Sequence, residues 1–177
     1  MKPHIIGLMH KLEFAERDDM LRLRPYKPCD AEKIVAWCRN EDTFHKWGGD
    51  HFGAYPIHAE IMNHVYYEKN GNCMEKDNFY PMTAFDEDGI CGHFIMRYIH
   101  GDNRVIRFGW VIIAPERRGK GYGKEMLSMG IQLAREIYRA DKLSIGVFVD
   151  NDSARHCYAS VGFRETETVN GIIEMEL

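Results

Sequence analysis

The chain has 177 residues, enough for one domain with a substantial core, so two independent enzymatic domains are excluded. Hydrophobic residues make up 45% of the chain and charged residues 28%, which excludes a disordered tail protein and a collagen-like repeat. The formal net charge is -4, so the chain lacks the basic field that holds nucleic acid by its phosphates. We expect a globular protein with no nucleic-acid partner.

Cysteine usage and hydropathy indicate the compartment. The five cysteines form an odd, widely spaced set without a Cys-x-x-Cys pair, so neither a disulfide framework nor a thiolate zinc site is predicted. No apolar run approaches the roughly 18 residues that cross a bilayer, and residues 1–20 carry too many charges for a signal peptide. The histidines lack the spacing of metal ligands. We therefore expect a cytoplasmic protein with no membrane partner and no metal.

The first half of the chain predicts an arm followed by mixed elements. Residues 1–19 are polar and weakly periodic, so we expect an N-terminal arm over 1–19 and one domain over 20–177. Alternation predicts a strand over 21–24, and helical spacing predicts helices over 30–39 and 59–69, the second with Ile61, Met62, Val65 and Tyr66 inward. Residues 42–55 are rich in glycine and aromatic residues and are predicted to form a loop.

The second half predicts an antiparallel meander and then a helix. Three strands are expected over 79–85, 90–98 and 104–113, separated by short polar turns. After Pro115 the apolar period becomes 3.6, which predicts a helix. Its apolar face consists of Met126, Leu127, Gly130, Ile131, Ala134, Ile137 and Tyr138. A strand over 143–149 and a helix over 153–161 follow, and a hairpin around Asn170-Gly171 closes the chain.

A glycine-rich turn joins the strand ending at Ile113 to the following helix. Three alternating glycines, Gly119, Gly121 and Gly123, can direct backbone N–H groups to one place, and the helix N-terminus adds a favourable dipole. This arrangement suits a phosphate group, with mobile positive charge supplied by Arg118 and Lys120.

Other interpretations of this glycine-rich turn agree less well with the sequence. A Walker loop fails because position 118 is not glycine and Lys124 is followed by Glu125. A Rossmann fingerprint fails because Lys124 stands where its third glycine belongs, and because the preceding strand ends a meander. A turn that only connects strand to helix explains one glycine well and three poorly, and it stays open as the structural alternative.

Two segments resemble the GNAT family of acetyl-CoA-dependent N-acetyltransferases. Arg118-Gly119-Lys120-Gly121-Tyr122-Gly123 matches its Arg/Gln-x-x-Gly-x-Gly/Ala signature, and residues 151–163 match a second motif, Asn-x-x-Ala-x-x-x-Tyr-x-x-x-Gly-Phe. The resemblance implies an α/β fold with a mixed, mostly antiparallel sheet, a splayed central strand pair and helices on both faces.

The resemblance also implies a binding site for acetyl-CoA as cosubstrate. Strands 104–113 and 143–149 would diverge, and the pantetheine arm would lie between them against backbone groups of Val111, Ile112 and Ile113. The pyrophosphate would lie on the turn of Arg118, Gly119, Lys120, Gly121, Tyr122 and Gly123. Asn151 would cap the next helix, contact the pantetheine amide, or do both.

Tyr158 is the implied catalytic residue. A phenol, with an ordinary pKa of about 10, can protonate the departing CoA thiolate. The alternative is a helix tyrosine that only packs. A general base is harder to name, because Arg107 stands where histone-modifying relatives carry glutamate. His93 or a water held by backbone carbonyls could substitute, although a lone strand histidine is more often structural.

The predicted activity is transfer of an acetyl group to a primary amine by direct attack in a ternary complex. The acceptor would be a small molecule or a peptide N-terminus, and the segment 21–25 looks like the ribosomal-protein N-terminal acetyltransferase subgroup. The alternative is an acyl-CoA-binding sensor or interaction module without turnover, and a homodimer is possible. Aromatic side chains between the first two helices either face the substrate or cover one end of the core: Phe44, Trp47, Phe52 and Tyr55.

Overall fold

A mixed seven-stranded sheet forms the centre of the molecule. The computed structural model describes residues 20–70, 78–99 and 101–177, so the predicted arm over 1–19 lies outside the described residues. The strands follow the order β1-β2-β3-β4-β5-β7-β6, and only β4 and β5 pair in parallel. This is the predicted fold class. The strands are β1 (Arg22–Pro25), β2 (Phe79–Asp86), β3 (Gly89–Ile99), β4 (Asp102–Ile113), β5 (Lys142–Phe148), β6 (Arg164–Val169) and β7 (Ile172–Glu176).

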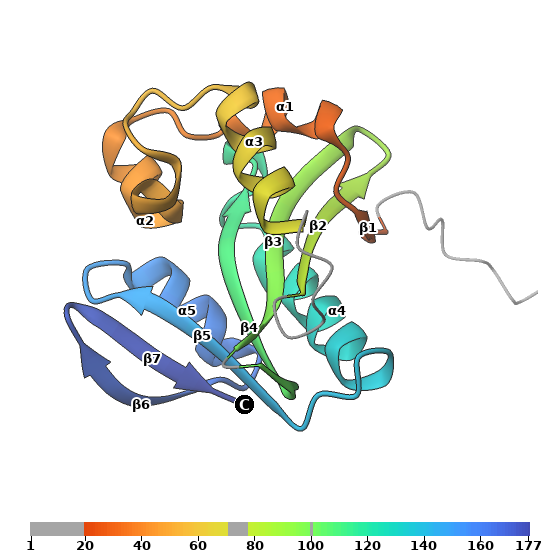
Figure 1. The fold of residues 1–177 in the computed structure, drawn as a ribbon, viewed down its shortest axis with the longest axis vertical. Helices are drawn as coiled ribbons and strands as arrows, with labels where there is room; N and C mark the ends of the chain where they lie inside the picture. Colours follow the sequence, from red (N-terminus) through yellow and green to blue (C-terminus); the bar gives the residue numbers. More distant parts are fainter. Residues whose placement is uncertain (1–19, 71–77, 100) are drawn as a thin grey trace, which may run out of the picture.

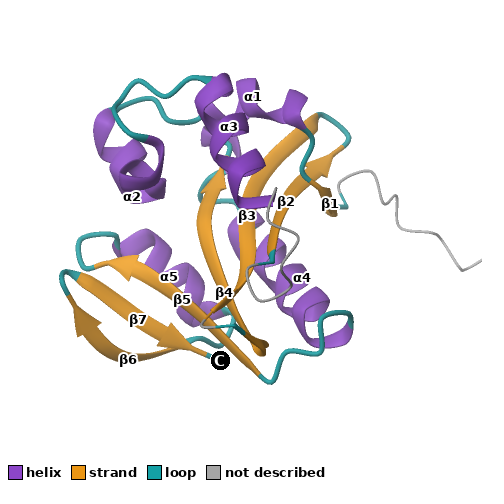
Figure 2. Ribbon diagram, in the orientation of Figure 1, coloured by secondary structure: helices purple, strands orange, loops and turns teal. Residues whose placement is uncertain are grey.

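Helices cover both faces of the sheet. Consecutive residues of a strand point to opposite faces, so His93 and Phe94 of β3 mark the two sides. Tyr66 reaches His93 from one side, whereas Phe94 packs where Gly130 leaves room on the other. Figure 2 accordingly shows α3 in front of the sheet and α4 behind it. The helices are α1 (Ala31–Val35), α2 (Glu41–Phe52), α3 (Ala59–Asn70), α4 (Tyr122–Glu136) and α5 (Asp152–Ser160). None of the described helices is long and apolar enough to cross a membrane.

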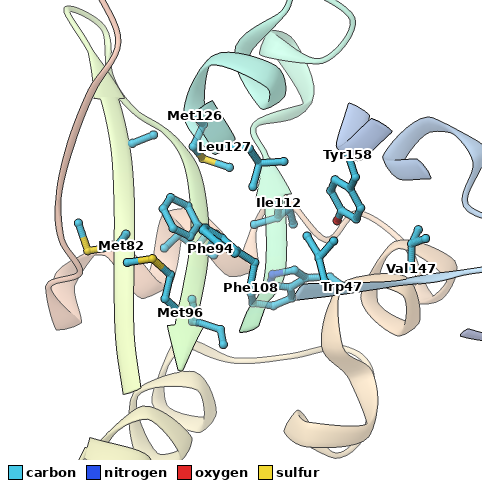
Figure 3. Packing of buried hydrophobic residues seen from close by; sticks show 14 of the residues in the cluster. Trp47, Met82, Phe94, Met96, Phe108, Ile112, Met126, Leu127, Val147 and Tyr158 are labelled. Carbon is cyan, nitrogen blue, oxygen red and sulfur yellow. The ribbon is translucent and has the colours of Figure 1, made fainter. Parts of the chain in front are cut away.

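One part of the core fills the space between the sheet and α4, and another part lies under α1, α2 and α3 on the opposite face. Phe94 and Phe108 are buried side by side with ring centroids 5.7 Å apart, and Met126 and Leu127 of α4 pack beside them (Figure 3). Burying one such side chain contributes about 1.5–3 kcal/mol. An added Cβ at Gly130 would lie 2.8 Å from Phe94, so this glycine lets α4 approach the sheet closely. The core therefore holds β3, β4 and α4 in fixed positions around the end of β4.

The predicted loop over 42–55 is wrong, because residues 41–52 form helix α2. The Asn40 side chain accepts a hydrogen bond from the Thr43 backbone N–H at 2.8 Å and caps the helix. Phe44, Trp47 and Phe52 lie on its buried side. The sequence therefore contains a capping asparagine and apolar residues at helical spacing. The helix is not predicted because two glycines interrupt this pattern.

Those glycines permit close packing and do not mark a loop. A Cβ added at Gly48 would lie 2.9 Å from Cδ1 of Trp110, and one added at Gly49 would lie 3.0 Å from the ring of Phe44. The helix is kinked at Gly48, where the backbone leaves helical geometry. Gly48 therefore lets α2 lie directly against Trp110 of β4, and Gly49 leaves room for the ring of Phe44 in the same helix.

Other element boundaries differ from the prediction in detail. The helix predicted over 30–39 is shorter, since a 3-10 turn over Pro28–Asp30 leads into α1 (Ala31–Val35). Ile61 and Ile137 were expected to face the core but are 44% and 68% exposed, because Ile61 lies in the first turn of α3 and Ile137 follows the end of α4. Val149 lies beyond β5 and is also exposed.

The C-terminal hairpin forms as predicted. Asn170 and Gly171 both have positive φ, 51° and 78°, as a two-residue turn matching the strand twist requires. They connect β6 to β7, and β7 pairs with β5 along the side that faces away from β4.

Candidate functional site

The parallel strands β4 and β5 separate halfway along their length. They pair from Val105 opposite Lys142 to Phe108 opposite Ile145, and beyond this point β5 keeps only its pairing with β7 on the other edge. The predicted splayed strand pair is therefore present, and Figure 1 shows the two strands parting toward α5.

A bulge in β4 lies next to this separation. His93 of β3 pairs with Ile112 and Ile95 pairs with Gly109, so Trp110 and Val111 together oppose a single residue. Trp110 has a φ of 47°, which is uncommon for a residue other than glycine. The bulge redirects the backbone of β4 at the level where the strands part.

Two adjoining cavities open at the separated strands. The first, which we call the turn cavity, has a volume of about 760 Å³ and runs from the end of β4 over the glycine turn to the start of α5. The second, the sheet cavity, measures about 390 Å³ and lies over the face of β3, β4 and β5. Both are lined by Lys46, Trp47, Val111, Asn151 and Tyr158, so these residues mark where the cavities adjoin.

The glycine turn leaves its backbone open to the turn cavity. Gly119 and Gly121 have φ values of 72° and 88°, and a Cβ added at either would meet nothing within 4 Å. These two glycines are therefore needed for backbone conformation and not for space. Gly121 is also the N-cap of α4 and has no side-chain acceptor for the first amides of that helix. Such amides and the helix dipole attract an anion.

The side chains of the turn differ in their placement. Arg118 donates from Nε to the carbonyl oxygen of Ile113 at 3.0 Å and from Nη2 to that of Trp37 at 3.3 Å. The mobile charge predicted for Arg118 is therefore wrong, because its guanidinium braces the turn against β4 and the residues after α1. Lys120 is exposed and Tyr122 bonds Asp86 through its hydroxyl at 3.1 Å; the lining of the turn cavity includes neither of them.

The remaining coenzyme residues predicted from the sequence come together at this site. Val111, Ile112 and Ile113 line the turn cavity, as do Gly119, Gly121 and Gly123. Ile112 is 4% exposed, so its side chain belongs mainly to the core.

Asn151 and Tyr158 reach the junction of the cavities from opposite ends of α5. The Asn151 side chain accepts from the backbone N–H of Ala154 at 3.3 Å, which confirms its predicted role as a helix cap. Tyr158 is 7% exposed, and its ring extends from α5 toward β4 (Figure 3). Burial, and secondarily the neighbouring Cys157, raise the pKa of Tyr158 above its ordinary value. The phenol is therefore protonated at neutral pH and can donate a proton.

The alternative base His93 does not face the cavities, and Arg107 stands in the sheet cavity at the place where histone-modifying relatives carry glutamate. His93 is fully buried outside both linings, and its Nε2 lies 2.6 Å from the hydroxyl of Tyr66. Burial lowers the pKa of His93 to about 3, so it is a neutral structural residue. Arg107 lines the sheet cavity and donates two hydrogen bonds, at 2.6 and 2.9 Å, to Glu174.

The aromatic residues predicted near the acceptor site divide into two groups. Trp47 lines both cavities, whereas Phe44 and Phe52 are buried in the core and belong to neither lining. Tyr55 is 36% exposed and contacts Phe44. The described residues include no group of three or more metal-ligating side chains.

The cavity residues that the sequence analysis missed include Lys69, Arg97 and Trp110. They come from α3, β3 and β4 and meet only through the fold. No local sequence pattern marks these residues, because a tryptophan at a bulge, a lysine on a helix and an arginine on a strand are common outside functional sites.

Comparison with known proteins is consistent with this geometry. A family model described as an acetyltransferase (GNAT) domain matches residues 20–164. The structure of spermidine N-acetyltransferase from Vibrio cholerae, in complex with CoA and spermine, superposes with a TM-score of 0.71. It is 22% identical and the match covers 89% of this chain and 94% of that chain, so it shows a shared fold.

Curated relatives match over shorter stretches. An uncharacterized N-acetyltransferase, YycN, from Bacillus subtilis is 46% identical over 52 residues, covering 29% of this chain and 33% of the relative. Spermidine N(1)-acetyltransferase from Vibrio cholerae is 34% identical over 70 residues, covering 40% and 38%. The chain thus spans about a third of the length of these relatives. These matches give no support to the ribosomal-protein subgroup suggested by residues 21–25.

Proposed function

The chain belongs to the GNAT acetyltransferase family, and from this premise we propose that it transfers the acetyl group of acetyl-CoA to a primary amine. The observation that carries the proposal is the placement of Tyr158 where the turn cavity and the sheet cavity adjoin. One cavity suits the coenzyme and the other suits an acceptor, so the two substrates would meet beside a proton donor. Transfer would occur by direct attack in a ternary complex.

The turn cavity fits the coenzyme. Its glycine turn presents open backbone at Gly119 and Gly121, and the first amides of α4 add favourable partial charge for a pyrophosphate. Arg118 would act through its hold on Ile113 and Trp37, which keeps the turn in shape. Lys120 and Tyr122 would contribute through their backbone, since their side chains are outside the lining.

The end of β4 would bind the reacting portion. Acetyl-CoA supplies an acyl group activated as a thioester. Backbone groups of Val111, Ile112 and Ile113 would contact the pantetheine and polarise the thioester carbonyl. Asn151 would add a contact to pantetheine while it caps α5.

Tyr158 would donate its proton to the leaving sulfur. The amine nitrogen forms a bond to the acetyl carbon, the carbon–sulfur bond breaks, and the sulfur receives the phenolic proton. The amine releases one proton to solvent water, and the Tyr158 phenolate regains a proton from solvent, so the net reaction forms the amide and the free CoA thiol. Burial raises the pKa of both Cys91, to about 12, and Cys157, so neither supplies a ready thiolate for an acyl-enzyme.

The acceptor remains a small amine or a peptide N-terminus in this proposal. The homodimer, the cytoplasmic location and the domain division at residue 20 stay predictions from the sequence.

An amine panel with the full-length protein tests the proposed function. Acetyl-CoA and each amine are mixed with the protein, and release of free CoA thiol is followed over time. We expect turnover with at least one primary amine and a raised melting temperature with CoA alone. Binding of CoA without turnover on any amine would favour the non-catalytic sensor. The absence of any CoA binding at millimolar concentration would contradict both functions.

A further inference from the structure

The sheet cavity is cationic although the protein as a whole is acidic. The chain has a formal net charge of -4, yet the described residues that line this cavity include Lys46, Lys69, Arg97 and Arg107 and no aspartate or glutamate. A cavity walled by protein concentrates the field of the charges that line it. The charge of the wall therefore selects among acceptors.

Two of these cations are neutralised by the protein itself. Lys46 lies 3.0 Å from Asp42 and 3.2 Å from Asp150, and Arg107 makes a bidentate pair with Glu174. Their charge is therefore already balanced by these carboxylates. They contribute shape and hydrogen-bond donors more than net charge.

Lys69 and Arg97 have no carboxylate partner among the described residues. Lys69 of α3 holds its Nζ 5.6 Å from the centre of the Trp110 ring, beside the bulge. Arg97 of β3 pairs in register with Arg107 of β4, so two like charges face each other across adjacent strands. Burial of part of the Arg97 side chain and repulsion from Arg107 both lower the pKa of Arg97. An anion beside Arg97 would balance the one of these two guanidinium groups that Glu174 does not already neutralise.

We propose that the sheet cavity binds the anionic group of the acceptor, and that the substrates are primary amines that carry a carboxylate or a phosphate. The assignment of the anion to an acceptor rests on the proposed acetyl transfer. Binding of an anion in the sheet cavity does not depend on that activity. A guanidinium can bind either group with two parallel hydrogen bonds, and Lys69 adds a further charge. Polyamines, after which the Vibrio cholerae relatives are named, would be repelled.

The register also indicates the length of the acceptor. Arg107 precedes Val111 by four residues, which is at most about 13 Å of strand, and the bulge at Trp110 shortens this span. The amine and the acid would therefore be separated by several methylene groups, and an ω-amino acid is a closer probe than an α-amino acid.

Matched six-carbon amines test the proposal. The probes are 6-aminohexanoate, 6-aminohexyl phosphate, hexylamine and 1,6-diaminohexane, which share a six-carbon primary amine and differ in the far end, and the rate of the diamine is halved to correct for its two equivalent amines. We expect kcat/KM for at least one acid to exceed that for hexylamine by about tenfold or more, as charge-assisted hydrogen bonds allow. The two acids distinguish a carboxylate site from a phosphate site. A preference for the diamine, or equal rates for all four, would overturn the proposal.

Variants assign the effect to the cavity. Arg97→Gln should lower the ratio of kcat/KM for the acid to that for hexylamine by roughly tenfold, and Lys69→Gln should lower it in the same direction. Arg104→Gln is the matched control, since Arg104 lies on β4, outside the lining, and pairs with Asp102. The ratio reports selectivity within each variant, so partial unfolding does not mimic the result. An unchanged ratio in both cavity variants would contradict the inference.

A binding measurement separates failure of the anion site from failure of acetyl transfer. Calorimetric titration of 6-aminohexanoate, 6-aminohexyl phosphate and hexylamine into CoA-saturated protein requires no turnover. Tighter binding of either acid supports the anion site even if no amine is acetylated. Equal binding of all three would overturn it. No binding of any of them at about 10 mM, a concentration above ordinary KM values, would also overturn it.

Discussion

The indole Nε1 of Trp47 donates a hydrogen bond of 2.8 Å to the carbonyl oxygen of Trp110. Trp110 is the bulged residue of β4, so this bond attaches helix α2 to the strand at the point where the two cavities adjoin. Gly48, the next residue of α2, allows the approach, since a side chain there would collide with the ring of Trp110. The shape of the turn cavity and the sheet cavity, the proposed coenzyme and acceptor sites, thus depends on a helix far away in the sequence.

Trp47→Phe should weaken both the fold and the coenzyme site. The substitution removes the donor to a partly buried carbonyl and some ring volume, and we expect the free energy of unfolding to fall by about 1–3 kcal/mol. The KM for acetyl-CoA should rise, because the bulge loses its support. Urea unfolding and initial rates measure the two effects. Leu143→Ala is the control: Leu143 is fully buried but lies outside both linings, so its variant should lose stability with unchanged KM.

Local signals in the sequence were sufficient for most of the fold. The meander of β2, β3 and β4, the glycine turn, α5 and the final hairpin each follow from a short repeating pattern or a specific turn. The residues over 111–123 and 151–158 therefore lie together as expected. They are local motifs, and their spacing specifies their structure.

The features that the sequence does not predict, helix α2, the bulge in β4 and the sheet cavity, depend on packing between residues far apart in the chain. Gly48 and Gly49 were interpreted as a loop because only the folded chain reveals the rings of Trp110 and Phe44 beside them. The bulge at Trp110 depends on register with β3. Lys69 and Arg97 belong to different elements and line the same sheet cavity. No periodicity along the chain predicts this arrangement.

Gly121→Val should reduce the affinity for CoA more than it reduces stability. Gly121 has a φ of 88° and open space around it, so a β-branched residue costs backbone strain of about 1–2 kcal/mol and also obstructs the phosphate approach. Gly53→Val is a close control, because Gly53 has a φ of 84°, equally open surroundings and a position outside both linings. Thermal unfolding with and without CoA distinguishes them. Similar CoA affinity in the two variants would make the turn a simple connector.

Asp30→Asn should make the protein less stable at pH 7 and flatten its acid dependence. Burial opposes ionisation of Asp30, but hydrogen bonds from Arg24, the backbone N–H of Lys27 and Thr83 outweigh it and lower its pKa. A lowered pKa stabilises the fold above the unfolded pKa of about 4, and this stabilisation is lost as the pH falls through the folded value.

We expect a loss of about 3 kcal/mol at pH 7, because the variant leaves Arg24 without its charged partner. The difference in stability from wild type should shrink toward pH 3. Urea unfolding from pH 3 to 7 measures both. Glu87→Gln, which breaks the exposed pair with Arg22, should change little at any pH. A constant difference across this range would show that the Asp30 charge contributes nothing.

A chain that begins at Met20 should fold and bind CoA. Leu21 is buried at 3% exposure and β1 begins at Arg22, so the first strand is complete in such a chain. Its melting temperature and its shift with CoA should match those of the full chain. A chain that begins at Tyr26 lacks β1, leaves the edge of β2 unpaired and should be markedly less stable. Loss of CoA binding in the first truncation would assign residues 1–19 to the domain.

Tyr158→Phe should lower kcat while leaving the affinity for acetyl-CoA nearly intact. The variant keeps the ring and its packing but removes the proton for the leaving sulfur, and general acid catalysis contributes a factor of roughly 10² to 10⁴. Because burial raises the pKa of Tyr158, the wild-type phenol stays protonated up to and beyond pH 10, so its ionisation should cause no fall in kcat between pH 7 and 10. Tyr138→Phe, outside both linings, should keep full kcat. The measurement needs an amine for which single-turnover kinetics show chemistry to be limiting. If Tyr158→Phe then retains the wild-type rate, the tyrosine only packs, and backbone polarisation at the end of β4 must support the departure of the thiolate without it.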